Sequence, residues 1–259
     1  MSIATTIFDR IDSGPLADII VRQIEDLIVQ RVLKEGDKLP SERELAERMN
    51  VSRPKLRDAL KALEERGLLT IRHGEGTFVA QLTGQAMQPA LIELYARHGR
   101  AFFDYLEYRR AQEGLAARLA AERATPTDRA QIERCLATLE DAEARDDVEA
   151  AREADVVFHA KITEASHNAM LIHMMASIYD LTRRGVFYNR EHLRTLDGTS
   201  KKLLEQHRLI AKTVLSGDAD AAEKAATEHM DFVEKSFRIG MQQAESETIA
   251  KKRAAMQND

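Results

Sequence analysis

The sequence is poor in the residues that mark several common classes of protein. It has one cysteine and no tryptophan in 259 residues, and only 5% of its residues are aromatic. The lone Cys135 cannot form a disulfide within the chain, which excludes a small disulfide-stabilised scaffold and indicates a reducing compartment. We expect this thiol to pack as a small apolar side chain.

Long apolar stretches are also missing. No run approaches the roughly 20 residues of a membrane-spanning helix, and the first residues, MSIATTIFDR, lack the apolar centre of a signal peptide. We therefore expect a cytoplasmic protein with no membrane partner. Hydrophobic residues make up 44% of the chain, which is enough to bury a core in one large or two ordinary domains.

An excess of positive charge is absent as well. The formal net charge is −5, which argues against indiscriminate binding to nucleic acid. Any affinity for DNA must come from a local basic cluster, and such binding would be selective and sensitive to salt.

A basic cluster of this kind lies between residues 39 and 79. Ser41 and Glu44 have the spacing of a capping box, which predicts a helix from about Glu42 to Met49 that Asn50 can end in a left-handed turn. A second helix is predicted to follow this turn directly.

The second helix should begin at Ser52, its N-cap, and end at Gly67, with Pro54 in the first turn. It has an apolar side and a basic side at helical spacing. The apolar side contains Leu56, Ala59, Leu60 and Leu63, and the basic side contains Arg53, Lys55, Arg57 and Lys61.

A hairpin pattern follows, in which residues 68–71 and 77–79 flank His73-Gly74-Glu75-Gly76, with Arg72 and His73 at the tip. A basic helix alone is as often a solvated surface as a binding face. A capped basic helix between a supporting helix and a hairpin is instead typical of a winged helix-turn-helix, whose guanidinium groups can bind guanine edges. We therefore expect DNA binding.

The segments LPSERELA, VSR, LRDAL, LEERGLL and GEGTFV resemble the reader domain of the GntR family of bacterial transcription regulators over essentially its whole length. The resemblance implies that Arg43, Arg53 and Arg57 touch the operator and that Gly74, beside His73 in the hairpin, approaches the minor groove. Ser52, Lys55 and His73 are further candidate DNA contacts, since basic side chains here can neutralise phosphate. Some relatives carry a hydroxyl residue where this chain has Pro54, so this position would lack one polar contact.

Another helix precedes this region, opened by Pro15, and its apolar side would support the other two. That side contains Leu16, Ile19, Ile20, Ile24, Leu27, Ile28 and Val32. We assign residues 1–79 to the DNA-binding domain and residues 80–89, which include Gly84 and Pro89, to a linker.

The rest of the chain is predicted to be helical, because Ala, Leu, Glu and Arg dominate it. The expected helices span about 90–98, 100–123, 128–145, 148–166, 169–195, 200–216 and 218–240. They predict an all-α bundle over residues 90–240 and a polar tail over 241–259 that frays, although the last helix could continue for some turns. The fold class is therefore mainly α.

Polar residues interrupt the apolar stripes of this bundle. Asp155 and His159 are four residues apart and therefore share a helix face. His207 and His229 lie 10 residues before and 12 residues after Gly217, so on antiparallel helices they would face each other at nearly the same height. A single inward histidine is more often a core residue than a ligand, but three with an aspartate favour a divalent metal site. Zinc is the first candidate, and nickel, manganese and iron remain open.

The same region resembles the FCD effector-binding domain of the FadR subfamily through EYRRAQEGLAARLAAERAT, DVVFHAKITEASHN, EQHRLI and EHM, and is most similar to regulators of the pyruvate dehydrogenase complex and of lactate utilisation. The resemblance implies that the metal ligands are Asp155, His159, His207 and His229. It also implies that Arg109 grips the carboxylate of a small effector, although an ion pair with Glu113 would explain Arg109 equally well.

Two functions from different classes remain. The first is a homodimeric transcription regulator that reads a palindromic operator, a repressor released by a small carboxylate. The second is a metal-dependent hydrolase joined to a DNA-targeting module. The motif HExxH is absent and no inward carboxylate stands out as a base for metal-bound water, so we expect a regulator and not an enzyme. The metal itself could also be the signal.

Overall fold

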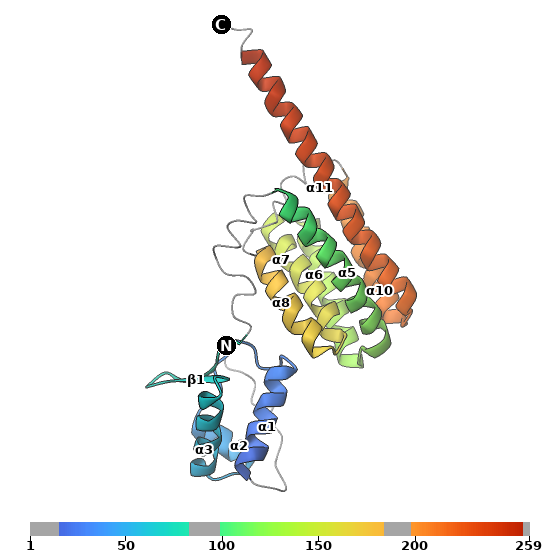
Figure 1. Ribbon diagram of the computed structural model, residues 1–259. Helices are drawn as coiled ribbons and strands as arrows, with labels where there is room; N and C mark the ends of the chain where they lie inside the picture. Colours follow the sequence, from blue (N-terminus) through green and yellow to red (C-terminus); the bar gives the residue numbers. More distant parts are fainter. Residues whose placement is uncertain (1–15, 83–98, 184–197, 256–259) are drawn as a thin grey trace. The chain divides into compact units, whose positions relative to one another are not determined.

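The computed structural model describes residues 16–82, 99–183 and 198–255 (Figure 1). The chain divides into two compact units, residues 1–84 and 85–259, and each is described by itself. Within the described ranges, no helix is both long enough and apolar enough to cross a membrane.

Three helices and a hairpin form the first unit. Helix α1 spans Leu16–Val29, α2 spans Glu42–Met49 and α3 spans Arg53–Glu65, and they are followed by β1 at Leu69–Arg72 and β2 at Gly76–Val79. Both α1 and α2 pack against α3. This order confirms the predicted winged helix-turn-helix.

Local hydrogen bonds explain where α2 begins and ends. Ser41 and Glu44 form the predicted capping box, in which each side chain accepts a hydrogen bond from the other residue's backbone N–H. Asn50 ends the helix in the left-handed region, with φ of 54°. Ser52 does occupy the N-cap position of α3, but its side chain makes no capping hydrogen bond, so that part of the prediction was wrong.

Helix α1 ends earlier than its apolar pattern suggested. It stops at Val29, and Arg31 then adopts a left-handed φ of 55°. Val32 was expected on the buried side of α1 but is 46% exposed, and Leu33 is buried instead. The left-handed turn breaks the helical period, so spacing along α1 no longer predicts which residues face the core.

The hairpin is a two-stranded antiparallel sheet in which Arg72 pairs with Gly76. Arg72 therefore belongs to β1 and not to the tip, which consists of residues 73–75. Gly76 has φ of 118°, and a Cβ atom there would lie 2.9 Å from Cε of Lys38. The backbone conformation favours glycine, whereas the exposed end of the Lys38 side chain could move away from a Cβ atom.

Every described part of the second unit is α-helical or a short turn, which confirms the mainly α fold class. Its helices are α5 (Gly99–Arg123), α6 (Pro126–Ala144), α7 (Val148–Ala165), α8 (Ala169–Arg183), α10 (Thr199–Ser216) and α11 (Ala219–Ala255). Helix α5 packs along α11, α6 along α7, and α10 against α11 (Figure 1). The expected helix at 90–98 and the last part of 169–195 lie outside the described residues.

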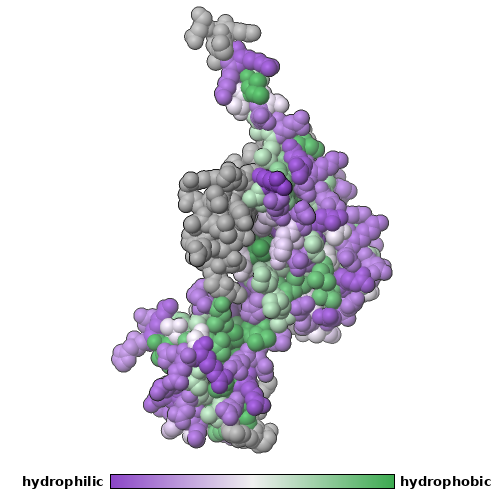
Figure 2. Space-filling view, in the orientation of Figure 1, coloured by the Kyte–Doolittle hydropathy of each residue, from purple (hydrophilic) through white to green (hydrophobic). Residues whose placement is uncertain are grey.

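Helix α11 is longer than expected. It continues to Ala255, well past Gly240, where the polar tail was predicted to begin. The additional residues are mostly strong helix formers, and Glu247 and Lys251 form an i,i+4 ion pair at 3.5 Å. In Figure 1 the last turns extend beyond the other helices of the bundle, and Figure 2 shows them as mainly hydrophilic.

Candidate functional site

Helix α3 has the two sides that the sequence indicated. Its apolar row is buried in the core of the first unit, and its basic residues are exposed. All seven residues predicted to contact DNA are exposed, namely Arg43, Ser52, Arg53, Lys55, Arg57, His73 and Gly74.

Arg43 and Arg53 come from different helices but line the same surface depression, beside Asn50. The short turn between α2 and α3 therefore brings two guanidinium groups to one face. Arg43 also lies 3.6 Å from Glu47, one turn further along α2. A face with two arginines can donate several hydrogen bonds to phosphates or base edges.

Arg57 is held by an ion pair between α3 and α2. Its Nη2 and Nε atoms lie 2.7 Å and 3.2 Å from Oε2 of Glu42. Hydrogen bonding to Glu42 raises the pKa of Arg57, and the same interaction lowers the pKa of Glu42. A DNA contact by Arg57 must therefore compete with Glu42 or share the guanidinium with it.

The tip of the wing presents His73 and Gly74, and Gly74 has a left-handed φ of 77°. Arg72 lies back along the hairpin, with its guanidinium carbon 4.6 Å from the ring centre of Phe78 and a nitrogen 3.6 Å from Glu75. The exposed tip therefore carries an imidazole, a glycine and the carboxylate of Glu75, which pairs with Arg72.

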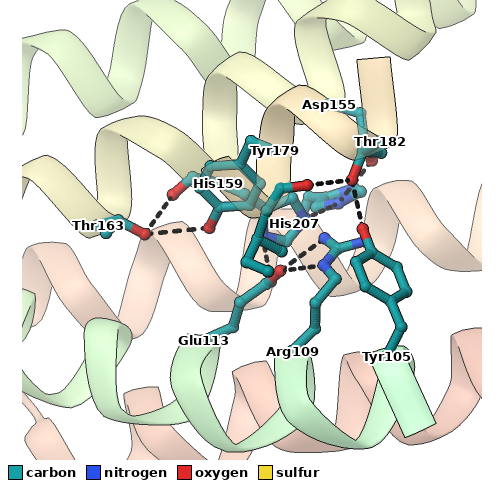
Figure 3. Close-up of polar contacts among 10 residues, drawn as sticks. Tyr105, Arg109, Glu113, Asp155, His159, Thr163, Tyr179, Thr182 and His207 are labelled. Atoms are coloured by element: carbon teal, nitrogen blue, oxygen red, sulfur yellow. Dashed lines mark hydrogen bonds and ion pairs between the residues drawn. The ribbon is translucent and has the colours of Figure 1, made fainter. Parts of the chain in front are cut away.

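Four residues predicted as metal ligands meet inside the bundle. Asp155 and His159 come from α7, His207 from α10 and His229 from α11, and all four are buried. The three histidines each offer a ligand atom within 4.8 Å of the others. Nε2 of His207 lies 3.2 Å from Nε2 of His159 and 3.2 Å from Oδ1 of Asp155 (Figure 3).

The predicted approach of His207 and His229 is confirmed by the separation of their ring centres, 4.6 Å. The two residues face each other because α10 and α11 pack together on either side of the left-handed turn at Gly217. The ring of Phe158 packs nearly perpendicular to the rings of both His159 and His207 and places apolar surface beside the cluster.

The second ring nitrogen of two of these histidines has an oxygen neighbour. Oε2 of Glu113 lies 2.7 Å from Nδ1 of His159, and Oε1 of Gln206 lies 3.2 Å from Nδ1 of His229. An imidazole that donates from one nitrogen presents a lone pair on the other. This donor set, imidazoles with a carboxylate and supporting oxygens, fits a divalent cation such as zinc.

Arg109 points into the same interior from α5 (Figure 3). Its Nε and Nη2 atoms lie 2.7 Å and 2.5 Å from Oε1 of Glu113. The rings of Tyr105 and Tyr179 lie beside the guanidinium, with centres 5.7 Å and 5.9 Å from its carbon. The ion pair considered from the sequence is present, and it lies directly beside a candidate metal ligand.

Glu113 is a further inward carboxylate at this site, beside the four candidate ligands. Glu113 is only 3% exposed. It lies in the same helical row as Arg109, so its inward direction could be predicted from the sequence. Its Oε2 atom approaches the Nδ1 side of His159, whereas Nε2 faces the other histidines. Glu113 therefore contacts His159 on the side away from the other histidines, and it is not placed as a base for a metal-bound water.

Sequence reasoning also missed the hydroxyl groups around Arg109. The hydroxyl of Thr163 lies 3.0 Å from that of Tyr179, and Tyr105 forms a hydrogen bond with Thr182. Periodicity cannot reveal these residues, because Thr and Tyr also fill ordinary positions in apolar rows. Together they make the surroundings of Arg109 polar although they are buried.

Burial and charge oppose each other at this site. Burial favours a raised pKa for Glu113, but Arg109 and His159 outweigh it and lower the pKa to about 2. Burial also favours a lowered pKa for His159, but Glu113 outweighs it, so the pKa is raised. Burial and the neighbouring histidines place the pKa of His229 well below its usual range. At neutral pH Glu113 is therefore charged, and His229 is neutral with a lone pair to donate.

Known proteins resemble both units. Residues 16–79 match the family described as bacterial regulatory proteins, gntR family, and residues 104–232 match the FCD domain. The putative L-lactate dehydrogenase operon regulatory protein of Escherichia coli K12 is 37% identical over 222 residues, 84% of each chain. The Glc operon transcriptional activator of that strain is 35% identical over 227 residues, 86% of this chain and 89% of the relative. The solved structure of Streptococcus agalactiae GntR covers 85% of this chain and 99% of its own, with 26% identity and a TM-score of 0.52.

A winged helix-turn-helix followed by a helical bundle with a polar interior defines a DNA-binding transcription regulator with an effector domain. The chain belongs to the GntR family of bacterial regulators, in the group that carries an FCD domain. Its relatives are transcription regulators and not enzymes.

Proposed function

We propose that this protein is a homodimeric repressor that senses a small carboxylate at a metal site in its bundle. The observation that carries the proposal is the convergence of Asp155, His159, His207 and His229. Arg109 is linked to this cluster by the carboxylate of Glu113, which contacts both Arg109 and His159. Buried polar groups are costly unless they have partners, so a cluster of this size favours a ligand.

The ligand set favours a divalent cation, with zinc as the first candidate and nickel, manganese or iron as alternatives. Such an ion, when bound, would supply a positive charge to which an effector oxygen can coordinate. The lowered pKa of His229, caused by burial and the neighbouring imidazoles, supports this assignment because a ligand must be deprotonated.

Arg109 is the proposed anchor for the carboxylate of the effector. A guanidinium has five N–H donors, so Arg109 can keep Glu113 as a partner and still bind a second carboxylate. One relative is named for an L-lactate dehydrogenase operon, and lactate is a small carboxylate of the proposed class. We therefore infer an effector of about this size, close to both Arg109 and the metal ligands.

For DNA, we infer that two copies of the reader unit bind a palindromic operator, because one helix in one major groove makes few base contacts. Residues Arg43, Ser52, Arg53, Lys55 and Arg57 would face the major groove and its phosphates. His73 and Gly74 would reach the adjacent groove. A protein bound to the operator in this way would work in the cytoplasm, where bacterial DNA lies.

We propose that effector binding releases the protein from DNA. The names of the relatives do not give this direction, since one is an activator and another is named only as a regulatory protein. A coupling free energy of about 1–3 kcal/mol between the two sites would change operator affinity about 5- to 150-fold. If the metal alone is the signal, operator affinity would change with metal and without any carboxylate.

The test combines metal analysis with thermal unfolding. We expect the purified protein to contain a divalent metal and its Tm to rise with L-lactate or a similar carboxylate only when the metal is present. His207→Ala should abolish both effects, whereas His167→Ala, which changes an exposed histidine paired with Asp128, should keep them. A wild-type protein without metal, whose Tm does not respond to divalent ions, would refute the proposal.

A further inference from the structure

Glu113 contacts two residues of the proposed site with its two oxygens. Oε1 accepts from Nε of Arg109 at 2.7 Å and lies 2.5 Å from Nη2, while Oε2 lies 2.7 Å from Nδ1 of His159. Both side chains of the ion pair are almost fully buried, with 5% and 4% exposed. One carboxylate therefore joins the proposed effector anchor to a proposed metal ligand.

The two nitrogens of His159 have different surroundings. Nδ1 faces Glu113, and Nε2 faces His207 at 3.2 Å, on the side where the other histidines converge. A neutral imidazole carries one N–H, and an ionised carboxylate can only accept. Glu113 therefore places the hydrogen on Nδ1 and leaves the lone pair on Nε2, the nitrogen that points into the cluster.

We propose that Glu113 is the positioning residue of the metal site, which sets the tautomer and the ring orientation of His159 while it holds Arg109 in place. This inference rests on the proposed metal site. It predicts that the two halves of the sensing site, the metal ligands and the carboxylate anchor, depend on the same acidic side chain.

The requirement for a carboxylate follows from the number of acceptors. A glutamine at this position has one oxygen, and Arg109, which has only donors, would take it. The amide NH₂ would then face Nδ1 of His159, which would have to accept, so the hydrogen would move to Nε2 and block the lone pair. Gln206 can serve His229 with its single amide oxygen because that contact needs only one acceptor.

The experiment compares the full-length wild type with Glu113→Gln, using Zn²⁺ as the probe and competition with a chromophoric chelator as the assay. We expect Glu113→Gln to bind Zn²⁺ about 10- to 100-fold more weakly, the usual effect of losing such a supporting group. Glu223→Gln is the matched control. It changes the same functional group in a partly exposed ion pair with Arg118, between α11 and α5 and away from the candidate ligands, and should leave Zn²⁺ affinity unchanged.

A second measurement does not depend on the folding of the variant. Proton–nitrogen correlation spectra of the metal-free wild type, recorded at alkaline pH above the raised pKa of His159 so that its imidazole is neutral, report which nitrogen of His159 carries the hydrogen. We expect the hydrogen on Nδ1 in the wild type. In Glu113→Gln it should lie on Nε2.

The outcomes separate the two ideas. A wild type that does not bind Zn²⁺ contradicts the proposed metal site itself, whatever the variant does. If the wild type binds Zn²⁺ and Glu113→Gln binds it equally well, the metal site stands and the role of Glu113 is refuted. A wild-type His159 with its hydrogen on Nε2 also overturns the inference, even if Glu113→Gln does not fold.

Discussion

Replacing Arg109 with methionine should destabilise the bundle by about 3 kcal/mol. The substitution keeps much of the side-chain volume but removes the charge, so the carboxylate of Glu113 stays buried without its arginine. Breaking a buried ion pair usually costs about 3–5 kcal/mol, because one charge is left without compensation. Glu113 keeps its contact with His159, which places the expected cost near the lower end of this range.

The sequence provides a convenient assay for this effect. The chain has no tryptophan, and all five tyrosines lie between residues 95 and 188, outside the first unit. Tyrosine fluorescence during urea unfolding therefore reports on the bundle alone. The free energy of unfolding comes from the midpoint and slope of this transition.

The neighbouring residue supplies the control. Arg110 forms an exposed ion pair with Asp231, in which both side chains are about half exposed. Arg110→Met should therefore cost no more than about 1 kcal/mol. The double variant Arg109→Met/Glu113→Leu should be more stable than Arg109→Met alone, because it leaves no unpaired charge. If Arg109→Met and Arg110→Met lose equally little stability, the reasoning from burial is wrong.

Three further predictions concern the DNA face and the packing of the bundle. Arg53→Ala should weaken operator binding by about 1–3 kcal/mol and relax base preference, whereas Lys61→Ala should weaken binding to all duplexes evenly. Fluorescence anisotropy with operator and scrambled DNA tests this. If Arg53→Ala loses the same affinity for both, Arg53 does not read the bases. Glu42→Gln should tighten binding to all duplexes, since it removes a negative charge beside Arg57 and releases that guanidinium; weaker binding would show that Glu42 orients Arg57 instead. Gly114→Ala should cost about 1–3 kcal/mol despite better helix propensity, because its Cβ would lie 2.7 Å from Cγ2 of Thr227. Adding Thr227→Ser should restore the Tm, and a single variant with unchanged Tm would show that α5 and α11 can separate.

Much of the reader unit could be predicted because its signals are local. The capping box at Ser41 and the left-handed Asn50 define α2 through hydrogen bonds between residues a few positions apart. The apolar and basic rows of α3 follow from the helical period alone. The error at Val32 has the same origin, since a period predicts burial only while the helix lasts.

The candidate ligands could be found for a similar reason. Histidines at helical spacing within apolar rows must face the interior, and His207 and His229 lie at comparable distances from the turn at Gly217. Sequence alone therefore predicted that these side chains approach each other, which their 4.6 Å ring separation confirms.

The tertiary structure alone decided which polar groups are shared between helices. The carboxylate of Glu113 meets Arg109 on its own helix, which spacing predicts, but it meets His159 only because α5 packs against α7. Likewise, Glu42 reaches Arg57 only through the packing of α2 on α3. Helical periodicity determines the direction in which a side chain points around the axis of its helix. It carries no information on the separation and rotation of two packed helices, and these decide which oxygen lies 2.7 Å from which nitrogen.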